Sequence, residues 1–246
     1  MSISKVFKES LAVAKGNLLI FIPMLAASVF SALVSLIVIG SAVPMMRDMS
    51  GEQIAANPEQ ALAGAGAAAG GMIVVAILGG LVGFLAHGMT VGMADLALKG
   101  EPAGLKNGWS RFTPRILPLL IAAVLVGILV GIGFMLLVLP GVILAFFLMF
   151  ALIAVMVDNL GATKAIGRSF KVVSKNFGAT FVTFLVIIGM GIITGLICFI
   201  LNLIPVLGQI LTLIVGAIYT GYVTIFLVRA YRELNLKTDS SPEVET

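Results

Sequence analysis

Apolar residues fill four long blocks without charge, and the charged residues are confined to the segments between them. The blocks cover residues 18–46, 70–94, 116–157 and 176–228. About 20 apolar residues suffice for a helix to cross a membrane. The last two blocks are longer than that, and each is interrupted, by Pro140-Gly141 and by residues 202–208, which include Pro205. Proline ends a helix and glycine permits a reversal, so each long block predicts two helices.

The pattern therefore predicts an all-α integral membrane protein with six transmembrane helices arranged as three hairpins. The predicted spans are residues 17–43, 70–98, 116–139, 142–158, 178–201 and 208–230. The composition agrees, because 60% of the residues are hydrophobic and only 11% are charged. Soluble domains carry about 25% charged residues.

A basic segment with its own periodicity precedes each hairpin. In residues 159–176, the four cations are spaced by four, three and four residues, while apolar residues occupy another side. This spacing predicts an amphipathic helix in the membrane interface, with Asp158 or Asn159 as its N-cap. Residues 3–15 and 103–113 predict two more such helices.

These units predict one membrane domain, residues 1–235, built from three pseudo-repeats. The pseudo-repeats are residues 1–98, 99–158 and 159–232, and the polar, acidic tail 236–246 is expected to be disordered. Lys5, Ser10 and Asn17 recur at identical spacing as Lys164, Ser169 and Asn176. Two explanations of this repeated spacing are open, namely common descent and the shared need for a basic helix to turn into a span.

Positive charge is distributed unequally between the two sides of the predicted bundle. Of the 15 Lys and Arg residues, all except Arg47 fall on the side that carries both termini. Basic loops remain in the cytoplasm. We therefore expect a protein of the prokaryotic cytoplasmic membrane with both its N- and C-termini in the cytoplasm.

The cations of the basic segments are candidate contacts to anionic lipid head groups or to a protein partner. These residues are Lys164, Arg168, Lys171 and Lys175, with Lys106, Arg111, Lys5 and Lys8. Basic residues next to a membrane contribute about 1 kcal/mol each at an anionic surface. The alternative is that these charges only set the topology. A homo-oligomer is also open, and nucleic acid is not expected as a partner.

A second group of residues is a candidate polar path through the bundle. It comprises His87, Asp95, Asp158, Ser28, Ser31 and Ser35. Polar groups inside a membrane often mark transport pathways. The alternatives are that His87 bonds to a neighbouring helix, that the two carboxylates pair with Lys99 and Lys164 or cap helices, and that the serines bond to backbone.

Glycines recur at spacings of four residues, which favours close packing of the second, third and fifth spans. The pairs are Gly66/Gly70, Gly79/Gly83, Gly88/Gly92, Gly127/Gly131 and Gly191/Gly195. The single cysteine, Cys198, excludes a disulfide within the chain. The sequence lacks metal-site spacings, nucleophile elbows and nucleotide-binding loops, so neither a metal, a cofactor nor enzymatic activity is expected.

Short motifs between residues 95 and 177 resemble a known family. They are Leu139-Pro140-Gly141-Val142, Asp158-Asn159-Leu160-Gly161-Ala162 and Ala165-Ile166-Gly167-Arg168-Ser169-Phe170. The chain resembles the membrane domain fused to some bacterial glycerophosphoryl diester phosphodiesterases, and related six-span proteins of bacteria and archaea. The resemblance implies a helical module associated with membranes and lipid metabolism. It implies no catalytic residue, because the phosphodiesterase activity belongs to a soluble barrel that this chain lacks.

The leading hypothesis is a membrane protein without enzymatic activity, acting as a lipid-interacting scaffold or accessory module. The rival is a transporter or channel for a small solute, using the polar path. An embedded lipid-modifying enzyme would require Asp95, Asp158 and His87 to converge within hydrogen-bond reach.

Overall fold

The computed structural model describes residues 2–47 and 58–240, and these residues form helices without any strand. The α-helices are α1 (Ile3–Gly16), α2 (Ile22–Arg47), α4 (Pro58–Leu98), α5 (Leu105–Phe112), α6 (Ile116–Leu136), α7 (Val138–Leu148), α8 (Ala151–Val157), α9 (Ala162–Lys175), α10 (Phe177–Leu201) and α11 (Leu207–Ser240). Short 3-10 helices, η1 (Leu18–Phe21) and η2 (Thr113–Arg115), lead into α2 and α6. The predicted all-α class is confirmed for this part of the chain.

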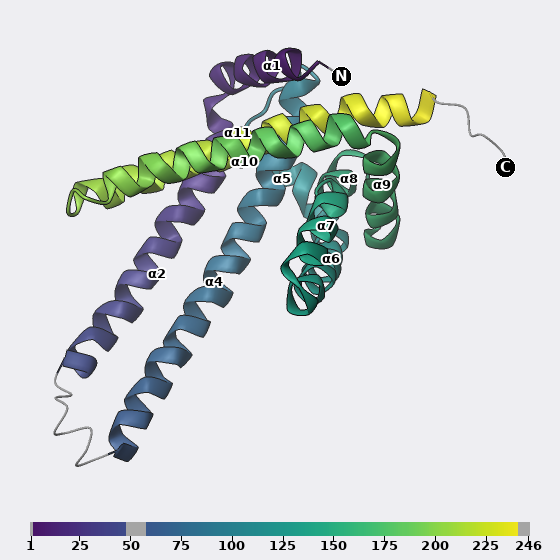
Figure 1. The fold of residues 1–246 in the computed structure, drawn as a ribbon. Helices are drawn as coiled ribbons and strands as arrows, with labels where there is room; N and C mark the ends of the chain where they lie inside the picture. The colour runs from purple at the N-terminus through teal and green to yellow at the C-terminus, as the bar shows by residue number, and fades with distance from the viewer. Residues whose placement is uncertain (1, 48–57, 241–246) are drawn as a thin grey trace.

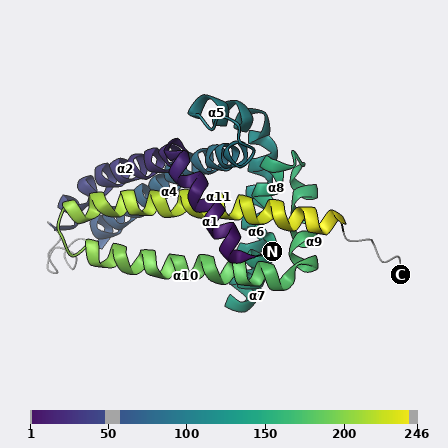
Figure 2. The ribbon, with the colours of Figure 1, turned by 90° about the horizontal axis from the view of Figure 1, so that it is seen from above.

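Six helical stretches in the described residues are long and apolar enough to cross a membrane. They are Leu18–Val38, Leu62–Leu98, Leu105–Leu136, Val138–Val157, Phe177–Leu201 and Leu207–Ser240. Consecutive long helices contact each other, α2 with α4, α6 with α7 and α10 with α11. The three pairs spread apart from a common end, as Figures 1 and 2 show.

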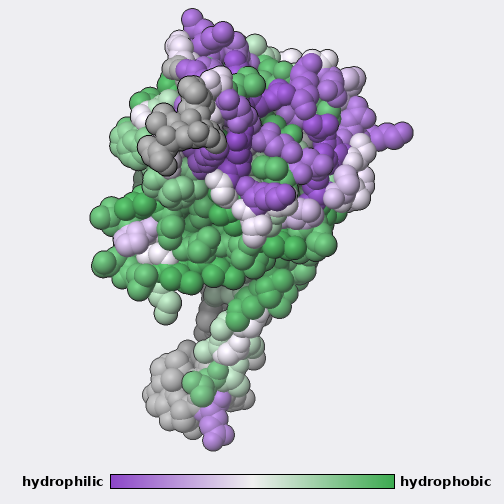
Figure 3. All heavy atoms as spheres, turned by 90° about the vertical axis from the view of Figure 1, so that its right-hand side faces the viewer, coloured by the Kyte–Doolittle hydropathy of each residue, from purple (hydrophilic) through white to green (hydrophobic). Residues whose placement is uncertain are grey.

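Helices α1, α5 and α9 and the C-terminal part of α11 gather at this common end (Figure 1). Hydrophilic residues concentrate there, and below them hydrophobic residues cover most of the face that Figure 3 shows, with a small hydrophilic group at its lower end. We call this end the polar cap. The predicted basic segments therefore form the short helices α1, α5 and α9 that precede each pair.

The buried core lies within and directly beneath the polar cap. Its largest fully buried side chains include Phe112 of α5, Phe150 between α7 and α8, and Phe226 and Tyr231 of α11. Far from the cap, large apolar side chains remain exposed, and Met135 is 91% exposed. Such a continuous apolar surface requires cover by lipid or by another protein surface.

The break between α6 and α7 differs from the prediction. It falls at Leu137, whose backbone is extended, whereas Pro140 lies inside the first turn of α7. The prediction of a break at Pro140-Gly141 is therefore wrong, because the first helical turn needs no amide donor at proline. Gly141 instead allows α6 to approach, since a Cβ added there would lie 2.5 Å from the Phe134 ring of α6.

The predicted fourth span is itself divided into α7 and α8. The Phe150 amide donates a hydrogen bond to the Ser169 hydroxyl over 3.2 Å, and this hydroxyl donates to the Phe147 carbonyl over 2.8 Å. Ser169 of α9 thus bonds to backbone groups at the break.

Helix α11 extends further than the sequence pattern indicated. It continues to Ser240, so the expected disorder is corrected for residues 236–240, while residues 241–246 lie outside the described part. Thr238 is buried and its hydroxyl accepts a hydrogen bond from the Asn176 amide over 2.9 Å. Contacts with α9 therefore stabilise helix where the composition alone favoured a tail.

The glycine pairs contribute to packing unequally. A Cβ added at Gly88 would overlap the Phe112 ring of α5, and one at Gly79 would lie 3.2 Å from the Ser31 hydroxyl. Gly83 and the pair Gly127/Gly131 have open space instead. Close packing through these glycines is therefore found for part of the second span, and not for Gly127 and Gly131 in the third.

We expect Gly88→Ala to destabilise the protein by about 1–3 kcal/mol, because the new methyl group displaces the Phe112 ring. Gly83→Ala is the matched control on the same helix, and its higher helix propensity makes it neutral or stabilising. Thermal unfolding in detergent, followed by circular dichroism, measures the difference. Equal midpoints for the two variants would contradict the α4–α5 packing.

Candidate functional site

Asp95 is a buried carboxylate at the centre of the polar cap. Its side chain is fully buried in the last turns of α4. The Lys99 Nζ and Arg111 Nη2 atoms donate hydrogen bonds to its Oδ2 atom over 2.8 and 2.7 Å. The Arg232 Nε atom lies 3.4 Å from Oδ1. One carboxylate thus holds a cation from α5, one from α11 and one from the residue that follows α4.

Local sequence explains how these groups meet. Lys99 follows Asp95 by four residues, so both side chains lie on one face at the end of α4. Gly92, one turn earlier, faces α5, where a Cβ would make an ordinary contact with the Arg111 Cβ at 3.7 Å. The expected pairing of Asp95 with Lys99 is present, and two arginines join it.

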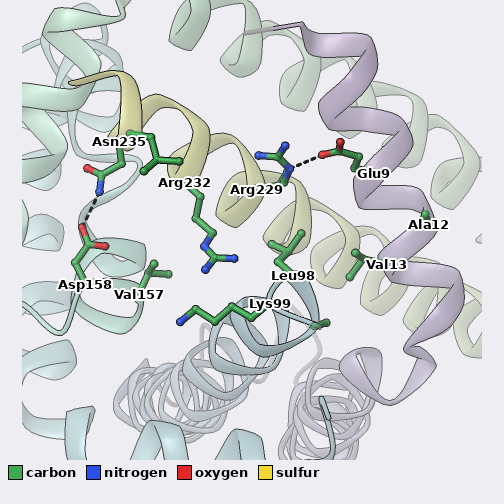
Figure 4. A pocket seen from close by; sticks show the side chains of 12 residues that line it. Glu9, Ala12, Val13, Leu98, Lys99, Val157, Asp158, Arg229, Arg232 and Asn235 are labelled. Atoms are coloured by element: carbon green, nitrogen blue, oxygen red, sulfur yellow. Dashed lines mark hydrogen bonds and ion pairs between the residues drawn. The ribbon is translucent and has the colours of Figure 1, made fainter. Parts of the chain in front are cut away.

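A pocket of about 660 Å³ opens beside this cluster, between α1, α11 and the ends of α4 and α8. Lys99, Arg229 and Arg232 contribute cations to its lining. Figure 4 shows Lys99 and Arg232 extending into the space, while Arg229 is directed toward Glu9. The Arg229 Nε atom donates a hydrogen bond to a Glu9 carboxylate oxygen over 2.5 Å. The lining is thus rich in charge and mixed in sign.

Asp158 lies on the opposite side of the same pocket (Figure 4). Its Oδ2 atom accepts hydrogen bonds from the Tyr231 hydroxyl over 2.5 Å and from the Asn235 amide over 3.2 Å. Asp158 therefore bonds to α11, whereas sequence analysis offered Lys164 or a capping role.

The N-cap of α9 is also different from the expected one. Helix α9 begins at Ala162, so Gly161 occupies the cap position, without a side-chain hydrogen bond. Asn159 has a positive φ of 56° and forms the turn before it. The prediction that Asp158 or Asn159 caps this helix is therefore wrong.

The eight predicted lipid contacts divide into two groups. The lysines are exposed at the surface of α1, α5 and α9, namely Lys5, Lys8, Lys106, Lys164, Lys171 and Lys175. The two arginines are half-buried and paired, Arg111 with Asp95 and Arg168 with Asp239. The hydrogen bond that Arg168 donates to the Asp239 carboxylate raises the pKa of Arg168. These arginines hold the cap together, and the lysines project from it.

The structure does not bring the candidate polar path together. His87 lines a separate cavity of about 560 Å³ whose other lining residues are apolar apart from Thr224. Helices α8 and α11 contribute to the lining of both cavities. Along α8, the fully buried Val155 lies between the residues that line one cavity and those that line the other, and Val228 does so along α11.

The three serines of the predicted path lie on α2. Ser28, Ser31 and Ser35 are half-buried there, and Ser31 faces Gly79 of α4. They line neither of these two cavities.

Sequence reasoning counted Arg229 and Arg232 only as topology signals and did not select Asn235 or Glu9. A usable signal was present, because residues 229, 232 and 235 recur every three positions on one face of α11. In the described residues, no group of three or more His, Cys, Asp or Glu side chains is placed to hold a metal ion.

Comparisons with known proteins give one match. Residues 116–234, from the start of α6 to near the end of α11, are similar to a domain of unknown function (DUF7847). No curated protein and no solved structure matches the chain. The resemblance to the membrane domain of glycerophosphoryl diester phosphodiesterases stays a prediction.

We expect Asp95→Asn to destabilise the protein by about 3–5 kcal/mol, because it leaves Lys99, Arg111 and Arg232 as unbalanced cations in a partly buried site. Asp239→Asn removes an exposed carboxylate from Arg168 and is expected to cost less than about 1 kcal/mol. Thermal unfolding of both variants in one detergent provides the comparison. Similar losses would show that Asp95 does not hold the cap.

Proposed function

We propose that this chain is an integral membrane protein that binds anionic phospholipids through its polar cap and acts as a scaffold or accessory module, not as an enzyme. The observation that carries the proposal is the arrangement of the short helices. They gather at one end of long apolar helices (Figure 1). Each presents exposed lysines and exposed aromatic residues.

The neighbouring side chains on these helices suit a membrane interface. Phe7 lies beside Lys8 on α1 and is 39% exposed, and Trp109 shares α5 with Lys106 and is 49% exposed. Phe170, beside Lys171 on α9, is 51% exposed. Aromatic rings prefer the boundary between hydrocarbon and water, where the lysine stems lie along apolar groups and the ammonium groups reach lipid phosphates.

In this proposal the three helix pairs cross the membrane as hairpins, and the cap faces the cytoplasm. The excess of Lys and Arg at the cap supports that orientation. The exposed apolar side chains away from the cap then contact lipid, which provides the cover that they require.

The transporter hypothesis has less support from the geometry. A solute path needs polar groups in a continuous cavity, yet the cavity at His87 and the pocket at Asp158 have no lining residue in common. The packed valines between them favour the lipid-binding interpretation.

The orientation is tested with single cysteines in a Cys198→Ala background. We expect Glu59→Cys, at the end far from the cap, to react with a membrane-impermeant maleimide in intact cells. Lys106→Cys, in the cap, should react only after the membrane is permeabilised. Labelling of Lys106→Cys in intact cells would overturn the proposed orientation.

Lipid preference is tested on α9, where Lys164, Lys171 and Lys175 are exposed and Arg168 can be left in its ion pair. We expect the triple Gln variant to lose at least about fivefold of the preference for phosphatidylglycerol over phosphatidylcholine, since each cation contributes about 1 kcal/mol at an anionic surface. Native mass spectrometry of the protein titrated with each lipid measures this ratio.

The matched control replaces the same three lysines with arginine, which retains the charge and should retain the preference. An unchanged ratio in the Gln variant would refute lipid binding by α9. A loss of preference in the Arg variant would show that the effect does not arise from charge.

A further inference from the structure

Two cations in the pocket at the polar cap have unused hydrogen-bonding capacity. Arg232 forms an ion pair with Asp95 at 3.4 Å but makes no hydrogen bond within the described residues. Lys99 uses one of its three donors, on the Asp95 Oδ2 atom. The side chains of Arg232 and Lys99 are 25% and 30% exposed, and both line the pocket. Their remaining donors are available to an occupant.

The carboxylate between them does not satisfy these cations. The Asp95 Oδ1 atom is buried and has no hydrogen-bond partner, although the Arg232 Nε atom is its neighbour. Arg111 already donates to Oδ2 from the side of α5. Three cations therefore share one carboxylate, and the cluster holds two positive charges in excess.

The other charged groups of the lining reduce this excess without removing it. Glu9 is paired with Arg229 at 2.5 Å, and Arg229 also lies 3.7 Å from Glu233. Asp158 faces the pocket from the opposite side and is bonded to Tyr231 and Asn235. Among the charged residues that line the pocket, the three cations Lys99, Arg229 and Arg232 exceed the two carboxylates of Glu9 and Asp158 by one positive charge. The pocket is thus suited to an anion of low charge with several acceptor oxygens.

We propose that Lys99 and Arg232 bind a phosphate group in this pocket. A phosphate offers acceptors to both the guanidinium fork of Arg232 and the ammonium group of Lys99, in charge-assisted hydrogen bonds. A volume of about 660 Å³ accommodates the group with its ester substituent. The phosphate comes from a lipid head group or from a soluble ion or ester, and only the lipid source rests on the proposed function.

The test measures binding of two probes to the full chain in neutral detergent. The probes are inorganic phosphate and short-chain phosphatidylglycerol, and calorimetric titration gives their affinities. We expect Arg232→Gln to weaken binding of the recognised probe at least about tenfold, because a charged hydrogen bond is lost. Lys164→Gln removes the same charge from the exposed surface of α9 and should leave the affinity of this site within about twofold.

A second pair of variants does not alter the Asp95 cluster. Ala12 lines the pocket from α1 and is exposed, so substitution there leaves the core intact. Ala12→Glu should weaken binding and Ala12→Lys should strengthen it, since the two variants add charges of opposite sign at the rim of the pocket. Opposite shifts show that the anion occupies this pocket even if Arg232→Gln proves unstable.

The outcomes separate the sources. Binding of inorganic phosphate alone identifies a soluble ligand, and binding of phosphatidylglycerol alone identifies a lipid head group. If the proposal holds, binding of either probe depends on Arg232. Absence of binding by either probe, or affinities unchanged in Arg232→Gln and both Ala12 variants, overturns it. The α9 lysine variant distinguishes this proposal from the proposed function. If that variant loses its lipid preference but keeps its affinity for the probe at the pocket, lipid binding by α9 is supported independently of the pocket.

Discussion

The buried charge of Asp95 is the constraint on which the polar cap depends. A carboxylate removed from water is costly unless cations compensate it, and here Lys99, Arg111 and Arg232 do so from three helices. The requirement fixes α5 against the end of α4 and brings α11 against α4. Without it, the short helix α5 would have only Phe112 and its neighbours to position it.

The cap and the long helices are consequently stabilised by different interactions. In the cap, buried aromatic and aliphatic side chains surround ion pairs, so the arrangement is specified by geometry and charge together. Away from the cap, the three helix pairs expose continuous apolar surface. Helix α2 contacts mainly α4 and α6 contacts mainly α7, whereas α11 contacts α2 and α4 as well as α10. If lipid covers that surface, as proposed, packing between the pairs gains nothing from the hydrophobic effect. The spread of the pairs in Figures 1 and 2 is the expected result.

The sequence predicted what depends on local composition and missed what depends on tertiary contact. Charge-free blocks located the six long helices, and spaced cations located α1, α5 and α9. The helix break at Leu137 was missed because proline is tolerated in a first turn. The convergence of Arg232 on Asp95 joins residues from α11 and α4, and no local pattern encodes it. The extension of α11 to Ser240 depends likewise on Arg168 of α9 and on Asn176, the C-cap of that helix.

The division between arginine and lysine in the cap follows from their chemistry. Four arginines of the cap form ion pairs, and their own side chains are 19–25% exposed. They are Arg111, Arg168, Arg229 and Arg232. The guanidinium group is weakly hydrated and holds a carboxylate with a rigid fork, which suits it to these partly buried positions. The ammonium group is strongly hydrated, and Lys5, for example, is 67% exposed although it lies 4.0 Å from Glu9. The arginines thus fix the helices to α11 and α4, and most lysines are left at the surface, where head groups of a membrane would meet them. Lys99 is the exception, since it stands in the pocket beside Arg232, and this position is what makes the pocket a candidate site.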